Sequence, residues 1–97
     1  MDAFKAIADP TRREILNMLS KKDMNAGDIA EHFQMSKPAI SKHLDILKNS
    51  DLISCEKQGQ YVVYSINTTA VQNIYRKFLE VFDGLQGVLQ NESTEKK

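Results

Sequence analysis

The chain has a single cysteine, Cys55, and no long hydrophobic run, and both absences exclude classes of protein. One thiol cannot form a disulfide within the chain, and no cysteines and histidines have the spacing of a zinc site. No segment approaches the roughly 18 consecutive apolar residues that a membrane-spanning helix requires. The N-terminus lacks a basic flank followed by an apolar signal core, so we expect a cytoplasmic location.

Catalytic motifs and excess charge are also lacking. The sequence shows no Ser/His/Asp grouping, no glycine-rich phosphate loop and no site for a metal-activated water. We therefore expect no enzyme activity, no small-molecule substrate and no cofactor. Thirteen basic residues balance 13 acidic ones in the 97-residue chain, so it has no overall charge to attract a polyanion. Any nucleic-acid-binding surface must be local.

Residues 26–48 show the pattern of two short amphipathic helices joined by a turn. The expected helices are Ala26–Phe33 and residues 37–48, and in each the apolar residues recur at the spacing that places them on one face. Each helix therefore has a buried face and a solvent-exposed face. This is the pattern of a helix-turn-helix.

The solvent-exposed face of the second helix is unusual because it carries small and basic residues. Ser41 and Lys42 point away from its apolar face, and Ser36 is placed to cap its first turn. Short side chains permit close approach to DNA, and lysines can meet phosphates. We expect this helix to enter a DNA major groove.

The flanking segments predict a capped helix before this motif and a hairpin after it. Asp9 is placed to cap a helix over Pro10–Leu19, in which the proline occupies the first turn. Alternating apolar residues predict strands over residues 52–56 and Tyr61–Ile66, joined by a polar turn in which Gly59 can adopt positive φ. A hairpin in this place is a wing, whose tip usually reaches the DNA backbone or the minor groove.

A short opening helix and a long last helix, over residues 68–89 with Asn67 as cap, carry more apolar surface than so small a body can bury. In the last helix these residues follow one another at alternating steps of four and three, the spacing of helices that pack lengthwise. We expect one domain over residues 1–90, a disordered polar tail over residues 91–97, and a homodimer. The expected dimer contacts are Phe4, Ile7, Val71, Ile74, Tyr75, Phe78, Phe82 and Leu85.

Two motifs, FKAIADPTRREIL at residues 4–16 and SKPAISKHL at residues 36–44, resemble the ArsR/SmtB family of bacterial repressors. The resemblance implies a mainly α winged helix-turn-helix with a small β-hairpin, which dimerises through its first and last helices. For His43 a structural role competes with phosphate contact. An ordinary solvated position competes with phosphate contact for four surface residues, which are Arg12, Arg13, Lys57 and Gln60. The full set of expected DNA-contacting residues is Ser36, Lys37, Pro38, Ala39, Ser41, Lys42, His43, Lys57, Gln58, Gln60, Arg12 and Arg13.

The metal sites of this family are not expected here. Asn25 and Gly27 stand where the resemblance places the cysteine pair, and the last helix has no histidine to join Glu80 and Asp83. Cys55 lies on a strand, where a lone thiol is usually a small buried hydrophobe, although a redox switch is the alternative.

The sequence thus predicts a homodimeric, sequence-specific DNA-binding repressor, an autorepressor in particular. Its operator should be an imperfect palindrome in double-stranded DNA with half-sites about 34–36 Å apart. Likeness to one autorepressor of the family implies a membrane protein that sequesters the repressor. Two alternatives stay open, a winged-helix module for protein–protein contact and a redox-sensing repressor that uses Cys55.

Overall fold

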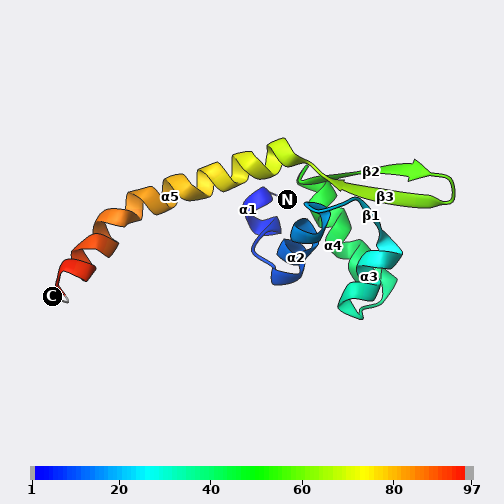
Figure 1. Cartoon of the computed structure of the whole chain (residues 1–97), viewed down its shortest axis with the longest axis horizontal. Coiled ribbons are helices and arrows are strands. Elements are labelled where there is room, and N and C mark those ends of the chain that lie inside the picture. The colour runs from blue at the N-terminus through cyan, green and yellow to red at the C-terminus, as the bar shows by residue number, and fades with distance from the viewer. Residues whose placement is uncertain (1, 96–97) are drawn as a thin grey trace.

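A computed structural model describes the backbone of residues 2–95 and the side chains of residues 2–88. The hairpin and the last helix leave the body at opposite ends (Figure 1). The elements, in chain order, are α1 (Ala3–Ala6), α2 (Pro10–Leu19), β1 (Met24–Asn25), α3 (Ala26–Phe33), α4 (Lys37–Asn49), β2 (Ile53–Gln58), β3 (Tyr61–Ile66) and α5 (Thr68–Glu95). The mainly α winged helix-turn-helix that the sequence predicts is confirmed.

Side-chain caps fix where four of the helices begin. In each case a side-chain oxygen of the capping residue accepts a hydrogen bond from the backbone amide three residues later, which satisfies a donor of the first turn. The capping oxygens lie 2.9–3.3 Å from these amides and belong to Asp9, Asn25, Ser36 and Asn67. All four caps were predicted, and so were the starts of the helices.

The helix ends and the strands differ from expectation in detail. α5 continues to Glu95, beyond the expected end at residue 89. The side chains of residues 89–95 and all of residues 96–97, where most of the expected tail falls, lie outside the described residues. β2 is Ile53–Gln58, a shift toward the wing tip from the expected residues 52–56, because pairing with β3 extends to Gln58 opposite Tyr61.

The wing belongs to a three-stranded antiparallel sheet in the order β1-β3-β2. β1 was not predicted; its two residues, Met24 and Asn25, pair with Tyr64 and Val63 of β3. Gly59 has φ +63° in the turn, as the sequence indicates. Pairing through β1 ties the wing to the start of α3, so hairpin and helix-turn-helix are parts of one structure.

The core lies between α2, α3 and α4, and α4 is its central helix. Ile40, Leu44 and Leu47 of α4 are all fully buried. The same cluster includes Ile15 and Leu19 of α2 and Ile29 of α3, with further residues from α1, the start of β2 and α5. Since one side of α4 is buried in this way, its other side is fixed toward the solvent.

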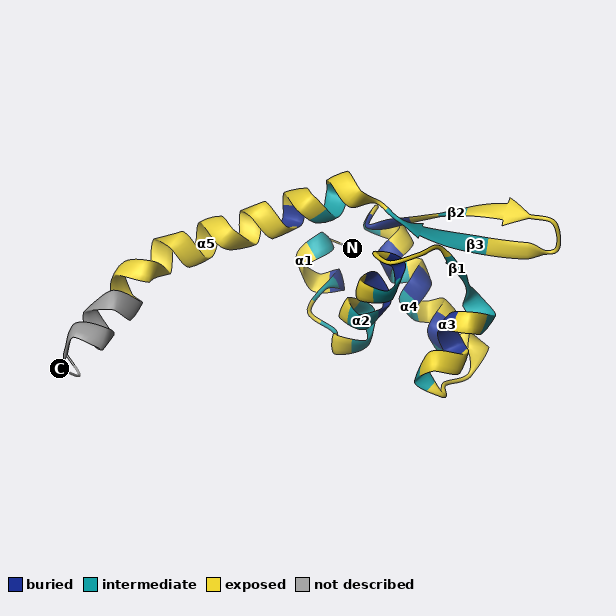
Figure 2. Cartoon of the chain, viewed as in Figure 1, coloured by how far each residue is buried: buried dark blue, intermediate teal, exposed yellow. Residues whose placement is uncertain are grey.

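α5 leaves the core after two turns. Ile74 is its last buried residue, at 8% exposure, and every side chain from residue 75 to residue 88 is exposed (Figure 2). A helix of this length extends for about 40 Å. Its outer part forms an arm whose apolar residues are not covered by the described part of the chain.

Candidate nucleic-acid interface

The leading end of α4 presents the small and basic residues predicted for DNA contact. Gln34 ends α3 in the left-handed conformation, at φ 57°, and turns the chain toward the cap Ser36. Beyond this turn Lys37, Ser41 and Lys42 are exposed. Pro38 and Ser36 are exposed as well, whereas Ala39 is half-buried. The first two turns of α4 therefore offer a surface that a polyanion can approach closely.

Lys37 connects this surface to α3. A Cβ added to Gly27 would lie 3.4 Å from Cε of Lys37 and 3.3 Å from Oδ1 of Asn25, so the lysine crosses the first turn of α3 where no side chain blocks it. The same residues line a polar hollow of about 440 Å³ that the wing residues Gln60 and Tyr61 also border. The hollow joins the wing and the helix-turn-helix into one continuous surface.

The wing adds polar side chains to this surface. Lys57, Gln58 and Gln60 are all exposed, as expected for residues that meet DNA. Tyr61, paired with Gln58 at the tip, is 62% exposed and was not among the predicted site residues. Because side chains alternate along a strand, the sequence indicates that Tyr61 shares a face of β3 with Val63 and lies on the opposite face from Val62.

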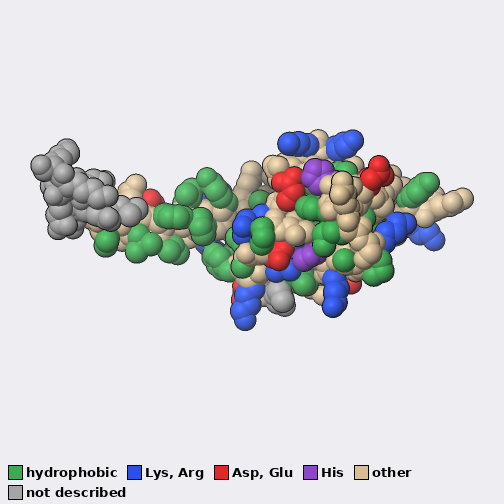
Figure 3. All heavy atoms as spheres, turned by 90° about the horizontal axis from the view of Figure 1, so that it is seen from below, with side chains coloured by type: hydrophobic (Ala, Val, Ile, Leu, Met, Phe, Trp, Pro, Cys, Tyr) green, Lys and Arg blue, Asp and Glu red, His purple; other side chains and the backbone are tan. Residues whose placement is uncertain are grey.

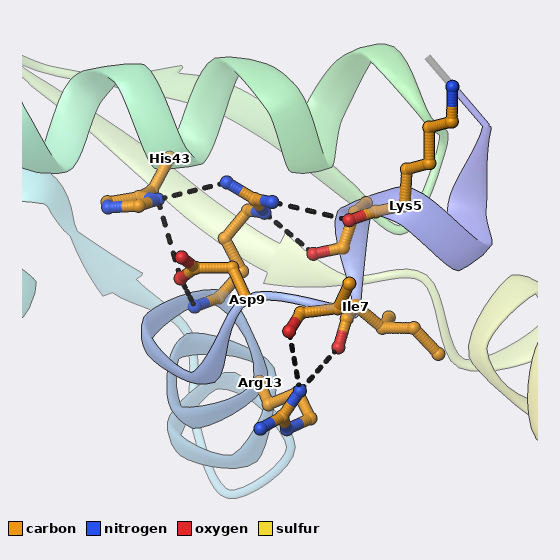
Figure 4. Close-up of polar contacts among 8 residues, drawn as sticks. Lys5, Ile7, Asp9, Arg13 and His43 are labelled. Carbon is orange, nitrogen blue, oxygen red and sulfur yellow. Dashed lines mark hydrogen bonds and ion pairs between the residues drawn. The ribbon is translucent and has the colours of Figure 1, made fainter.

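His43 and Arg12 are half-buried and Arg13 is exposed, yet all three contact the protein itself. Figure 4 shows the contacts of His43 and Arg13. A guanidinium nitrogen of Arg12 lies 3.3 Å from Nδ1 of His43, and the histidine side chain is 20% exposed. Arg13 donates to the carbonyl oxygens of Ile7 and Ala8 at 2.8 and 3.0 Å. All three residues therefore make structural contacts. For His43 this agrees with the structural role that the sequence offers as one of two alternatives.

Asp9 completes this cluster. Burial raises the pKa of its carboxyl, but the hydrogen bond from the backbone amide of Arg12 and the charge of the Arg12 guanidinium outweigh that effect, so the pKa lies below its ordinary value of 3.8. The charged carboxylate is therefore the form that the folded protein favours.

Replacing Asp9 with alanine should lower the free energy of unfolding by about 1 kcal/mol at neutral pH, because α2 loses its cap. Since the pKa is depressed on folding, this contribution is complete above about pH 4 and is lost as the pH falls through the lower folded value. Urea denaturation of both proteins at about pH 7 and about pH 3 checks this. The control Asp9→Asn retains a cap and should lose little at neutral pH. A difference between wild type and Asp9→Ala that is equal at both pH values would contradict the prediction.

A second surface, apolar and distant from the wing, lies where α5 crosses α1 and α2. A groove of about 610 Å³ is bordered by Phe4 of α1 and Ile7 at its end, by Leu16, and by Tyr75 and Phe78 of α5. Hydrophobic side chains continue along the arm (Figure 3), where the rings of Phe78 and Phe82 meet edge to face at 4.8 Å.

The residues predicted for dimer contact fall into three groups by exposure. Phe4, Tyr75, Phe78, Phe82 and Leu85 are exposed. Ile7 and Val71 are half-buried against the core. Ile74 lies within the core of its own protomer and offers little surface to another chain.

Cys55 is half-buried on β2, opposite Tyr64 and next to Lys48. Its hydrogen bond with Lys48 raises the pKa of that lysine, and burial, together with Cys55, raises the pKa of Tyr64. Among the described residues, no three or more His, Cys, Asp and Glu side chains are placed to hold a metal ion. None of the described helices is long and apolar enough to cross a membrane.

Comparison with known proteins finds transcriptional regulators in both sequence and structure. A family profile described as bacterial regulatory protein, arsR family, matches residues 9–54, from the cap of α2 into β2. The chain is 58% identical over 72 residues to the transcriptional repressor SdpR of Bacillus subtilis (strain 168), an overlap that covers 74% of this chain and 80% of SdpR. It is 40% identical over 64 residues to the arsenical resistance operon repressor of Staphylococcus xylosus, covering 66% of this chain and 62% of that one.

Solved structures agree over more of the chain. The crystal structure of a possible transcriptional regulator for arsenical resistance superimposes with a TM-score of 0.83 at 26% identity, over 94% of this chain and 96% of that one. NolR from Sinorhizobium fredii gives a TM-score of 0.68 at 32% identity, over 81% of this chain and 79% of its own.

Proposed function

Because the chain belongs to the ArsR family of bacterial transcriptional repressors, whose winged helix-turn-helix it carries, we propose that it represses transcription by binding a specific operator as a homodimer. The observation that supports this most is the division of α4 into two sides. Ile40, Leu44 and Leu47 are fully buried, so Ser41 and Lys42 are held outward on a rigid helix. A rigid, outward-facing set of donors is what base recognition requires.

In this proposal the first two turns of α4 enter the major groove. Ser41 and Lys42 reach base edges or the flanking phosphates, and Lys37 meets a phosphate from the first turn. Ser36, Pro38 and Ala39 allow close approach of the backbone. The wing contacts the adjoining backbone through Lys57, Gln58 and Gln60, which are exposed at its tip.

Dimerisation is proposed to place two such surfaces on one side of the duplex. The groove between α1 and α5 and the exposed rings of Phe78 and Phe82 would be covered by the same elements of a second copy. A twofold axis through this contact requires a palindromic operator, with half-sites about 34–36 Å apart. Occupation of such a site within a promoter excludes polymerase, and we propose that the promoter of the protein's own gene is one target.

Release from DNA is proposed to depend on a protein partner, a membrane protein that sequesters the repressor. Two observations support a partner of this kind. The described residues have no cluster suited to a metal ion, and the arm of α5 exposes Val81 and Val88 at the edge of its apolar stripe.

Replacing Lys42 with alanine should reduce operator affinity about tenfold while the protein remains dimeric, because an exposed cation at the DNA is lost. Fluorescence anisotropy with DNA from upstream of the gene, at about 50 and about 200 mM salt, measures both the affinity and its salt dependence. Lys48→Ala is the matched control, since Lys48 is in the last turn of the same helix beside Cys55, and it should change affinity less than about twofold. If both substitutions lowered operator affinity equally, the proposal that the first two turns of α4 contact the DNA would be contradicted.

The same titration separates the proposal from its alternatives. A winged-helix module for protein–protein contact would show negligible binding at both salt concentrations, whereas phosphate contacts must weaken as salt rises. A redox-sensing repressor would lose operator affinity in this titration once Cys55 is oxidised, either to a sulfenic acid or, because that cysteine is the only one in the chain, to a disulfide that joins two chains.

A further inference from the structure

Arg12 contacts two helices other than its own. Its Nε donates to the carbonyl oxygen of Ala6 at 2.6 Å, and a terminal nitrogen donates to that of Lys5 at 3.3 Å. The other terminal nitrogen lies 3.3 Å from Nδ1 of His43, on α4. One guanidinium group therefore joins the end of α1 to the middle of the helix that carries Ser41 and Lys42 (Figure 4).

The geometry of the guanidinium group suits this position. It holds several N–H donors in a fixed plane, so it can bind carbonyl oxygens on one edge while another donor reaches the histidine. To accept this bond, Nδ1 must be unprotonated, which places the imidazole proton on Nε2. The capping carboxylate of Asp9, 3.9 Å from the same Nδ1, lies beside the pair and offsets the charge of the arginine.

The bridge also connects the two surfaces of the molecule. α1 borders the apolar groove through Phe4, with Ile7 at its end, and α4 carries the polar surface. Arg13, the next residue, bonds only to carbonyls of the segment that follows α1 and has no bond to α4. Both arginines thus bond to carbonyl oxygens at or just after the end of α1, but only Arg12, which is half-buried, also reaches His43 on α4.

We propose that Arg12 is a positioning residue for DNA recognition, which fixes α4 relative to the dimer-forming helix α1 through its contact with His43; this rests on the function proposed above. Two consequences follow. Operator binding and dimerisation are coupled through the bridge, so each strengthens the other by the same factor. Arg12 and His43 contribute to affinity without touching the DNA, so they are not counted among the phosphate contacts.

The test measures operator affinity and its salt dependence for Arg12→Gln and Arg13→Gln, which remove equal charge from adjacent positions. Arg12→Gln should weaken operator binding about tenfold, the scale of one hydrogen bond to a charged group, and Arg13→Gln less than about twofold. The probe is a duplex selected by the wild-type protein from a random pool, with a scrambled duplex for comparison. Because no phosphate contact is lost, the slope of log affinity against log salt should stay at the wild-type value.

Substitutions at the other end of the bridge show whether the effect passes through the histidine. His43→Ala should weaken binding as much as Arg12→Gln, and the double variant should be no weaker than either single one. His43→Asn should restore most of the affinity, since its amide oxygen can accept from Arg12 near the position of Nδ1. Should Arg12→Gln unfold the protein, as circular dichroism would reveal, the comparison of His43→Ala with His43→Asn tests the bridge on its own.

Several outcomes would overturn the proposal. Equal losses for the two arginine variants would assign the effect to charge or to the stability of α1. A salt slope lower by about one would make Arg12 a phosphate contact, and additive losses in the double variant would separate it from His43. If the wild-type protein selects no duplex from the pool, the proposed function itself fails; if it binds and the variants behave alike, only the bridge fails.

Discussion

Replacing Phe78 with glutamate should dissociate the proposed dimer and abolish operator binding at concentrations that saturate the wild-type protein. Phe78 is 43% exposed at the end of the apolar groove, where its ring meets that of Phe82. In the proposed dimer the new carboxylate would be buried in this apolar contact, and the one cation that lines the groove, Arg13, is already bonded to the carbonyl oxygens of Ile7 and Ala8. An unpaired buried charge costs about 3–5 kcal/mol, so the dimer dissociation constant should rise at least about 100-fold.

Asn73→Glu is the matched control for this substitution. It adds the same charge to the same helix, but at a position on the opposite, polar side, next to Arg76. Sedimentation equilibrium should find this variant dimeric and its operator affinity close to that of the wild type. If Phe78→Glu also remains dimeric, or binds the operator as tightly while monomeric, the proposed contact is wrong.

Replacing Leu44 with alanine should lower the free energy of unfolding by about 2–5 kcal/mol, a large fraction of the stability of a small domain. Leu44 is fully buried at the centre of the core, and truncation leaves a cavity that the surrounding helices fill only in part. The loss affects function directly, because Leu44 holds α4 in place one turn after Ser41. Urea denaturation followed by circular dichroism measures the change.

Leu79→Ala removes the same atoms from an exposed position, where the leucine is 42% exposed on α5. It should cost less than about 1 kcal/mol when both variants are compared at one protein concentration. Similar losses for the two substitutions would mean that the core is not centred on α4.

The sequence predicts the helices well because their signals are local. Asp9, Asn25, Ser36 and Asn67 each cap a helix within three residues of themselves, so the start of each helix can be found without knowledge of the fold. The outward direction of Ser41 and Lys42 follows in the same way from helical periodicity.

Features that depend on residues distant in the chain could not be predicted. β1 has only two residues, too few to show alternation, and it exists because β3 lies alongside it. The contact between Arg12 and His43 spans 31 positions and depends on how α2 packs against α4. Ile74 shares the apolar stripe of α5 with Phe78, and only the point at which the helix leaves the body decides that one is buried and the other exposed.

The central claim, that two copies present two α4 helices to one operator, is tested most directly by the mass of the protein–DNA complex. Light scattering on the isolated complex, with the protein at micromolar concentration and a single palindromic duplex, gives the number of chains bound. We predict that every complex contains two chains per duplex. No complex with a single chain should form, even when DNA is in excess. A complex of one chain with one half-site, formed as tightly as the complex with the full palindrome, would contradict the account.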